Sequence, residues 1–466
     1  MVDGSGRLRV INERRTSSSE NSCLSLWKTV TVCIIISILV QCALPYIQSF
    51  FTYHFKKRST PVGNLIETRT NSQKVKASYL VEPFAVDRYV EATSGEIVRK
   101  LVDDYLEESS ARDSEALAAL SAAKNALKNG HAARCKFIMD HALALSPNHP
   151  DILAEYGVYL ETLGEDLIKA DGFYAKALAF NPHQSTALVG QERTRSVVTE
   201  MDDNELKELT IMRDSFASLP HSSVVRRAMR ESYFAHVFHT VAIEGNTLSL
   251  GETRSILETG MPIFGKSLIE HNEVLGVDAA LRFLNRTLID NNGFTMEDIL
   301  SIHRHVLGHV SPVDAGTIRS TQVYVGRFTP VAPSEVYGQM EELIEWLNDE
   351  STARMDPVER AAIAHYKLVL IHPFVDGNGR TSRLLMNLLL MRSGFPPVIL
   401  PVEDKALYYA TLHTANLGDL RPFVRFVAKH TRYTLQKYLQ LSSTCTTIKC
   451  QQAEESAKNE QRIPTN

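Results

Sequence analysis

Residues 357–391 read PVERAAIAHYKLVLI-HPFVDGNGRTSR-LLMNLLLM, and this stretch decides the fold. The first segment, 357–371, would be apolar on nearly every side of a helix, which is typical of a helix at the centre of a core. The last segment, 384–391, is equally apolar and predicts a second buried helix. Between them lies a polar loop, 372–383, with two glycines and two arginines. A charged loop of this kind between two core helices indicates a functional site.

The composition of the loop indicates that it binds an anion. Gly377 and Gly379 let a ligand come close to the backbone N–H groups, and the start of the following helix adds further N–H groups. Arg380 and Arg383 are three residues apart, so both guanidinium groups lie on one side of that helix. Two such groups suit a polyphosphate, because each can bind phosphate oxygens with two parallel hydrogen bonds.

Two other side chains of the loop fit phosphate chemistry. Asp376 is a carboxylate among groups that bind anions, which we explain by a Mg²⁺ (or Mn²⁺) ion held together with substrate phosphates. A histidine side chain ordinarily has a pKa near neutrality, which suits His372 to take a proton from a hydroxyl. The chain has no P-loop motif, no protein-kinase motif set and no H-E-x-x-H, so these phosphate and zinc enzymes are not supported.

The loop matches H-P-F-x-D-G-N-G-R-x-x-R in full, and on this motif the chain resembles the Fic family. The resemblance implies an all-α catalytic domain, residues 226–440, that moves AMP from ATP onto a protein hydroxyl and releases pyrophosphate. It implies that His372 is the catalytic base and Asp376 the metal ligand. The loop residues that it assigns to nucleotide binding are Asp376, Gly377, Asn378, Gly379, Arg380, Thr381, Ser382 and Arg383.

A second motif, TVAIEGN at 240–246, is similar to the inhibitory helix of the same family. A carboxylate at Glu244 would pair with Arg383 and remove the group expected to bind the γ-phosphate. Thr240 and Glu244 are therefore the expected inhibitory residues. By the resemblance, Glu244 also orients a water molecule for removal of AMP, so that one site would work in both directions.

Residues 321–330 alternate β-forming residues around a glycine and predict a small β-hairpin, which the resemblance identifies as a flap over the nucleotide. A flap of this kind holds the target segment by main-chain pairing. The resemblance adds seven residues to the nucleotide site, namely Val325, Gly326, Arg327 and Phe328 from the flap and Tyr408, Tyr409 and Asn416 beside the adenine.

Residues 114–190 contain an internal repeat. Ala142 and Ala177 are 35 residues apart, as are Pro147 and Pro182. This period, with small residues inside helices and a proline at the end, resembles two tetratricopeptide repeats, which bind partner proteins. Two ordinary amphipathic helix pairs are the alternative. The polar segment that follows, 191–225, predicts a linker helix.

Residues 28–50 predict a single transmembrane signal-anchor helix. They contain 19 consecutive uncharged residues, from Thr29 to Ile47, which nearly span a hydrocarbon core of ~30 Å. Trp27 and Tyr46 lie beside its two ends, as aromatic residues do at membrane interfaces. A buried core helix and a cleaved signal peptide are the alternatives.

The topology of such an anchor has to come from other features, because basic residues balance on its two sides. The sequon at Asn285 matters only if the C-terminal part is lumenal, and it favours that orientation and a glycosylated Asn285. We therefore expect a single-pass type II protein of the endoplasmic reticulum membrane, with residues 1–27 cytosolic, 51–113 forming a stalk and the catalytic domain lumenal.

Composition limits the remaining possibilities. A chain of 466 residues suggests about three domains, and 44% apolar residues exclude a wholly disordered chain. A net charge of −4 disfavours a nucleic-acid binder, and none is expected as a partner. Six cysteines without a CxxC pair indicate neither a disulfide scaffold nor a structural zinc site. The polar segment 441–466 predicts a disordered tail.

The order of these segments resembles the metazoan endoplasmic-reticulum Fic adenylyltransferases along almost the whole chain. The resemblance implies a homodimer that adenylylates a Ser or Thr of BiP, a lumenal heat-shock chaperone, and that removes the AMP again. One alternative is another Fic chemistry, such as phosphorylation or UMP transfer. The other is a membrane-tethered repeat adaptor with an inactive Fic core.

Overall fold

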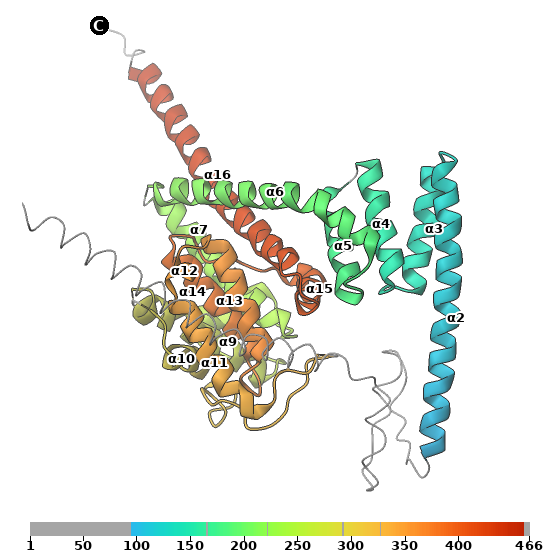
Figure 1. The fold of residues 1–466 in the computed structure, drawn as a ribbon. Coiled ribbons are helices and arrows are strands. Elements are labelled where there is room, and N and C mark those ends of the chain that lie inside the picture. The colour runs from blue at the N-terminus through green and yellow to red at the C-terminus, as the bar shows by residue number, and fades with distance from the viewer. Residues whose placement is uncertain (1–94, 165, 221, 291–292, 327, 461–466) are drawn as a thin grey trace, which may run out of the picture. The chain divides into compact units, whose positions relative to one another are not determined.

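The computed structural model describes residues 95–460 apart from 165, 221, 291–292 and 327, and side chains between 109 and 440. This part of the chain is helical and contains no β-strand, which confirms the all-α prediction (Figure 1). The predicted cytosolic tail (1–27), the predicted transmembrane helix (28–50) and most of the predicted stalk (51–113) lie outside the described residues.

The membrane localisation expected from the sequence has to be corrected. No helix among the described residues is long and apolar enough to cross a bilayer. The longest of them carry charged side chains along much of their length. A single-pass protein of the endoplasmic reticulum membrane is therefore not supported, and the segment on which that expectation depended is not among the described residues.

The N-terminal helices of the described chain form two consecutive pairs followed by one long helix. They are α2 (Gly95–Lys128), α3 (Ala132–Leu145), α4 (Pro150–Leu163), α5 (Leu167–Phe180) and α6 (Ser185–Ala217). Pro147 and Pro182 follow the ends of α3 and α5, and Gly130 and Gly164 provide left-handed turns inside the two pairs. The sequence period therefore corresponds to one helix pair. Its assignment to the tetratricopeptide class stays a prediction.

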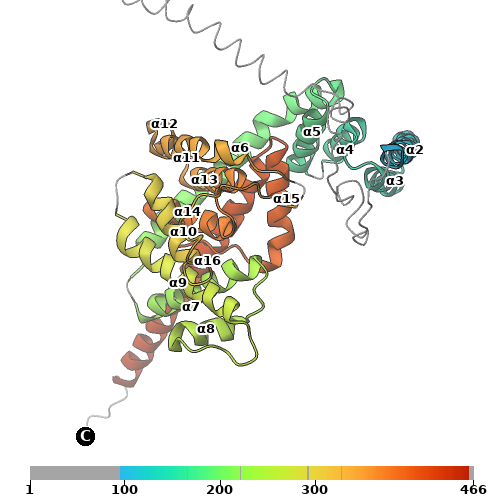
Figure 2. The same ribbon diagram turned by 90° about the horizontal axis from the view of Figure 1, so that it is seen from below.

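The C-terminal helices form the larger unit of packing. They are α7 (Ser223–Ile243), α8 (Leu250–Thr259), α9 (Leu268–Phe283), the π-helix η3 (Leu284–Leu288), α10 (Met296–Leu307), α11 (Pro333–Asn348), α12 (Glu350–Ala353), α13 (Pro357–Ile371), α14 (Asn378–Arg392), the 3-10 helix η4 (Val402–Asp404), α15 (Lys405–Asn416) and α16 (Arg421–Glu460). As the sequence predicts, α13 and α14 pack against each other inside this group, surrounded by α7, α9, α10, α11 and α16 (Figures 1 and 2). One hydrophobic core joins these helices.

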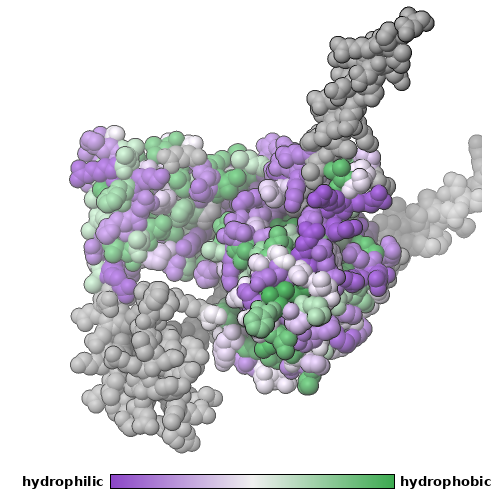
Figure 3. Space-filling model, turned by 180° about the vertical axis from the view of Figure 1, so that it is seen from behind, coloured by the Kyte–Doolittle hydropathy of each residue, from purple (hydrophilic) through white to green (hydrophobic). Residues whose placement is uncertain are grey.

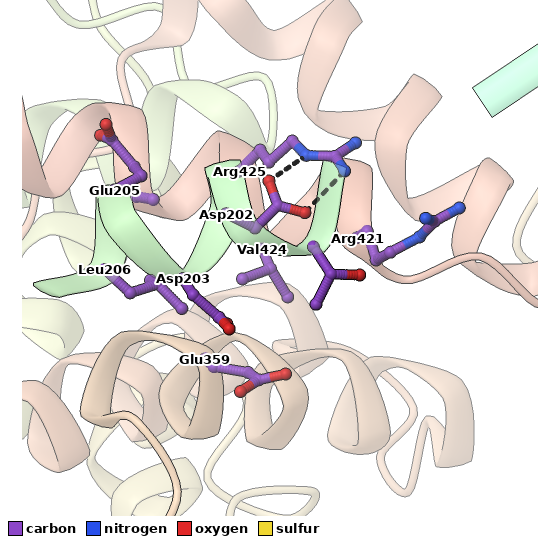
Figure 4. Close-up of a pocket in the computed structure, with 10 residues that line it drawn as sticks. Asp202, Asp203, Glu205, Leu206, Glu359, Arg421, Val424 and Arg425 are labelled. Carbon is purple, nitrogen blue, oxygen red and sulfur yellow. Dashed lines mark hydrogen bonds and ion pairs between the residues drawn. The ribbon is translucent and has the colours of Figure 1, made fainter. Parts of the chain in front are cut away.

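Helix α6 belongs to two cores, because Ala187 lies in the core of the repeats and Leu206 and Leu209 lie in the core of the C-terminal helices. It begins earlier and ends earlier than the predicted linker helix (191–225). Arg425 of α16 holds both carboxylate oxygens of Asp202 of α6, at the edge of a cavity of about 120 Å³ (Figure 4). Helix α6 is therefore attached to the C-terminal helices by an ion pair as well as by apolar packing.

The C-terminus differs from the predicted disordered tail (441–466), because α16 continues to Glu460. No glycine or proline lies between Phe423 and Glu460 to end the helix. On the face seen in Figure 3, hydrophilic and hydrophobic residues are mixed.

Candidate active site

The candidate catalytic turn (residues 371–373) begins where α13 ends, and His372 directly follows the last helical residue, Ile371. His372 has φ 52° and ψ 60°, and it is the one non-glycine residue of the described chain with a positive φ. Its Nδ1 lies 3.2 Å from the carbonyl oxygen of Val369. A carbonyl can only accept, so Nδ1 carries the proton and Nε2 is left free to accept one. Burial lowers the pKa of His372, and the nearby Arg319 lowers it further, so the ring is neutral at pH 7.

The loop after His372 is stabilised by hydrogen bonds from Asn378 and by packing of Phe374. The Asn378 side chain accepts a hydrogen bond from the backbone N–H of Phe374 and donates one to its carbonyl, both at 2.9 Å. The Phe374 ring stacks on His303 with ring centres 3.6 Å apart. The amide of Asn378 is thus used within the loop, so a contact from this residue to the α-phosphate would have to come from its backbone.

Arg380 and Arg383, the two arginines in the first two turns of α14, are buried and paired with carboxylates. Arg383 donates to Glu244 at 2.6 Å and to the backbone carbonyl of Thr240 at 2.8 Å. Arg380 donates to Asp376 at 2.8 Å and to Glu273 at 3.2 Å. The sequence prediction that Glu244 pairs with Arg383 is therefore confirmed as a contact.

The carboxylate of Glu244 also lies against the first turn of α14. Glu244 follows the last residue of α7, and a Cβ atom added to Gly379 would meet its Oε1 at 2.4 Å. The first-turn N–H groups of a helix have no partner within the helix and attract negative charge. Burial alone would lower the pKa of Arg383, but Glu244 offsets this and the pKa is raised. Glu244 therefore occupies the position that the sequence assigns to an anionic ligand.

The flap is less regular than the predicted hairpin. Val325 and Phe328 exchange two backbone hydrogen bonds, at 3.0 and 2.9 Å, and form one isolated bridge around the turn at Gly326. Arg327 lies outside the described residues. Tyr324 beside the bridge is 63% exposed. The predicted segment is thus a tight turn without strands on either side.

The three residues expected beside the adenine lie on α15 but not on one face. Tyr408 is 2% exposed, and its hydroxyl lies 3.0 Å from Nε2 of His365 and 3.5 Å from Arg383. Tyr409 is 43% exposed. Asn416 is exposed and accepts a hydrogen bond from Tyr366 at 3.2 Å. Tyr408 supports Arg383 from inside the core, which leaves Tyr409 and Asn416 as the side chains open to a nucleotide.

The remaining predicted loop residues, Thr381 and Ser382, are buried, and Ser382 donates to the carbonyl of Asn378. The described residues contain no cluster of three or more metal-ligating side chains. Asp376 is a single carboxylate whose side chain is 64% exposed. This fits Mg²⁺, which keeps several waters and takes its other ligands from substrate phosphates.

Sequence reasoning missed three residues that organise the site. Glu273 of α9 joins Arg380 to Asn246, which donates to it at 2.8 Å. His303 of α10 accepts from the N–H of Gly316 and donates to the carbonyl of Asp376, both at 2.9 Å. Arg319 bonds to the catalytic turn. No local motif marks any of them, because each acts on a segment far away in the sequence.

Comparison with known proteins agrees with this geometry. The Fic/DOC family matches residues 293–390. Protein adenylyltransferase fic-1 of Caenorhabditis elegans is 48% identical over 455 residues, which cover 94% of this chain and 89% of that protein. Protein adenylyltransferase Fic of Drosophila melanogaster is 47% identical over 340 residues, which cover 73% of this chain and 69% of that protein. The solved structure of C. elegans Fic-1 is 57% identical with a TM-score of 0.65, over 71% of this chain and 98% of that one. This chain therefore belongs to the Fic/DOC family.

Proposed function

We propose that this protein is an adenylyltransferase that moves AMP from ATP onto Ser or Thr hydroxyls of a protein. The observation that carries the proposal is the position of a neutral histidine, with Nε2 free to accept a proton, beside an anion site made by two buried arginines and a helix N-terminus. Relatives that match most of this chain are named for the same activity.

The chemistry follows from these groups. His372 takes the proton of the target hydroxyl, whose oxygen attacks the α-phosphorus of ATP. The bond from the α-phosphorus to the bridging oxygen breaks, and pyrophosphate leaves with the electron pair. Arg380, Arg383 and the first N–H groups of α14 bind the phosphates and stabilise their charge. A Mg²⁺ ion, when bound, would be held by Asp376 and would neutralise part of the phosphate charge.

Autoinhibition by Glu244 is part of the proposal. Its carboxylate holds Arg383 at 2.6 Å, so a γ-phosphate has to displace it before that guanidinium is available. Because Arg383 is buried, the pair is weakly screened by solvent. We further propose, from the resemblance alone, that Glu244 orients water for removal of AMP at the same site.

The target and the assembly are also proposals. The resemblance favours the heat-shock chaperone BiP as target, and the helix pairs α2–α3 and α4–α5 offer the repeat surface typical of partner-binding domains. A homodimer is supported by exposed apolar residues in the loop after α8 and in the first turn of α9, namely Met261, Phe264, Leu268 and Ile269. Asn285 is exposed on η3, and its glycosylation stays a prediction.

Labelled nucleotides test the activity. The protein is incubated with a candidate chaperone and α-labelled ATP, γ-labelled ATP or labelled UTP, and the label on protein is measured. Label from α-labelled ATP alone supports AMP transfer. Label from γ-labelled ATP indicates phosphorylation and label from UTP indicates UMP transfer, either of which contradicts the proposal. An absence of label from every nucleotide, in the wild type and in Glu244→Gly, indicates an inactive adaptor.

A further inference from the structure

Arg319, in the loop between α10 and α11, is a buried arginine whose hydrogen bonds all end on backbone carbonyls. Its side chain is not accessible to bulk solvent, since the residue is only 3% exposed. The guanidinium donates from Nε to His372 at 2.7 Å, from Nη1 to Thr321 at 3.0 Å, and from Nη2 to Val331 at 2.6 Å and to Ile371 at 3.4 Å.

These four carbonyls belong to two functional segments. Thr321 is the first residue of the flap, and Val331 directly follows its end. Ile371 and His372 form the turn that presents the imidazole. The backbone N–H of Arg319 adds a hydrogen bond to the carbonyl of Pro373 at 2.9 Å. One residue therefore holds both ends of the flap and three consecutive residues of the catalytic turn.

A buried arginine without an ion-pair partner is a poor way to stabilise a fold, so a purely structural role does not explain Arg319 well. In the described part of the chain no carboxylate forms an ion pair with Arg319, and burial lowers its pKa. A buried charge without a counter-charge is often less stabilising than an apolar residue of similar size. Departures of this kind are expected at functional sites.

The catalytic turn needs such support. His372 has the left-handed backbone conformation that non-glycine residues avoid, and such residues persist only where their surroundings fix them. Resting on the adenylyl transfer proposed above, we propose that Arg319 is a positioning residue that holds His372 and the two ends of the flap in a fixed relative position. It acts through the backbone and contacts no reacting atom.

The positive charge of Arg319 allows the positioning role to be distinguished from a merely structural one, because it affects the pKa of His372. The charged groups that face His372 are Arg319, Glu244 and Asp376. Arg319 lowers the pKa of His372, whereas the two carboxylates raise it. Removal of the positive charge at Arg319 should therefore raise the pKa of His372, and the acidic limb of the pH–kcat profile should move to higher pH.

The test compares Arg319→Met and Arg319→Lys in a Glu244→Gly parent, which frees Arg383. Both variants should bind ATP within about threefold of the parent and lose about 30-fold or more in kcat, because a misplaced catalytic group costs up to about 100-fold. The acidic limb should move to higher pH in Arg319→Met and stay in place in Arg319→Lys, which keeps the charge but not the planar fork.

Arg392→Lys is the matched control. Arg392 also donates to backbone carbonyls, of Leu288 and Gly293, but it lies at the far end of α14 from the catalytic turn. This variant should keep kcat within about threefold of the parent. Its loss of thermal stability should be similar to that of the Arg319 variants. ATP binding shows whether the Arg319 variants are folded. If both variants bind ATP and keep the parent's kcat, the proposal is wrong. It is also wrong if Arg392→Lys lowers kcat as much as they do.

Failure of the proposed function gives a different result. A parent that transfers no AMP contradicts the adenylyl transfer itself. In that case, NMR titration of the His372 imidazole in the wild type and in Arg319→Met tests the positioning role of Arg319. An unchanged pKa and unchanged backbone shifts at His372 would contradict the positioning role.

Discussion

The catalytic loop (372–383) and the flap (321–330) are built in opposite ways. The loop is closed by Asn378, packed on His303 and anchored by two buried arginines. The flap has one isolated backbone bridge, and Tyr324 beside it is largely exposed. Reacting groups need a fixed geometry, whereas a segment that pairs with the main chain of a target has to adapt to it. Substitutions in the loop should therefore change the chemical step, and substitutions in the flap should change target binding.

The largest effect is expected from His372→Ala. The variant lacks the base that accepts the hydroxyl proton, so AMP transfer should fall by about 10³-fold or more. ATP affinity should stay within about threefold, because the anion site is made by other residues. Single-turnover transfer and calorimetric ATP titration measure the two quantities. Transfer at the parental rate would contradict the assignment of His372 as the base.

The next effect is expected from Glu244→Gly, which opens the anion site. A hydrogen bond between charged groups is worth about 1.5–3 kcal/mol, so freeing Arg383 should raise transfer by about 10- to 100-fold. Self-modification should rise with it, and removal of AMP should be lost. Labelled-ATP assays in both directions measure this. Glu258→Gly, which removes an exposed carboxylate of α8, is the control, and equal rates in the two variants would mean that Glu244 does not inhibit.

A smaller effect is expected from Tyr324→Ala in the flap. The side chain is exposed and next to the bridge residue Val325, so its loss should raise the KM for the protein target by about 3- to 10-fold and leave the ATP affinity unchanged. Steady-state kinetics with varied target measure it. Tyr433→Ala removes a similarly exposed tyrosine from α16 and serves as control. A fall in kcat without a change in KM would place Tyr324 with the catalytic loop instead.

The same contrast explains which features could be predicted from the sequence. The loop and its two helices follow from local signals, namely apolar segments, two glycines and the spacing of Arg380 and Arg383. The Glu244–Arg383 pair joins residues that are 139 positions apart, and it was expected only from the resemblance to the family. Glu273, His303 and Arg319 were missed because the partners of a side chain between distant segments leave no periodic pattern.

The errors also have physical causes. Residues 321–330 alternate like a hairpin, but Arg319 binds the carbonyls at their two ends, and among the described residues of the segment one bridge forms. The polar composition of 441–466 suggested disorder, yet nothing in 441–460 breaks the helix that precedes it. Tyr408 and Tyr409 face different surroundings, because a helix turns by about 100° per residue, and the place of both beside the adenine stays a prediction.

The smallest effect concerns pH, and it sharpens the contrast because only the loop carries the titrating base. His372 must be neutral to accept a proton, and burial lowers its pKa below the ordinary value of about 6.5. The rate of transfer should therefore fall mainly below about pH 6.5. An ordinary imidazole is half protonated at about pH 6.5 and would halve the rate relative to its high-pH value, whereas His372 should reduce it by less than twofold. Measurement of kcat between about pH 5 and 8 tests this, with KM for the target as the internal control. An acidic limb centred above about pH 6.5 would mean that His372 is more solvated than the structure indicates, or that another group is the base.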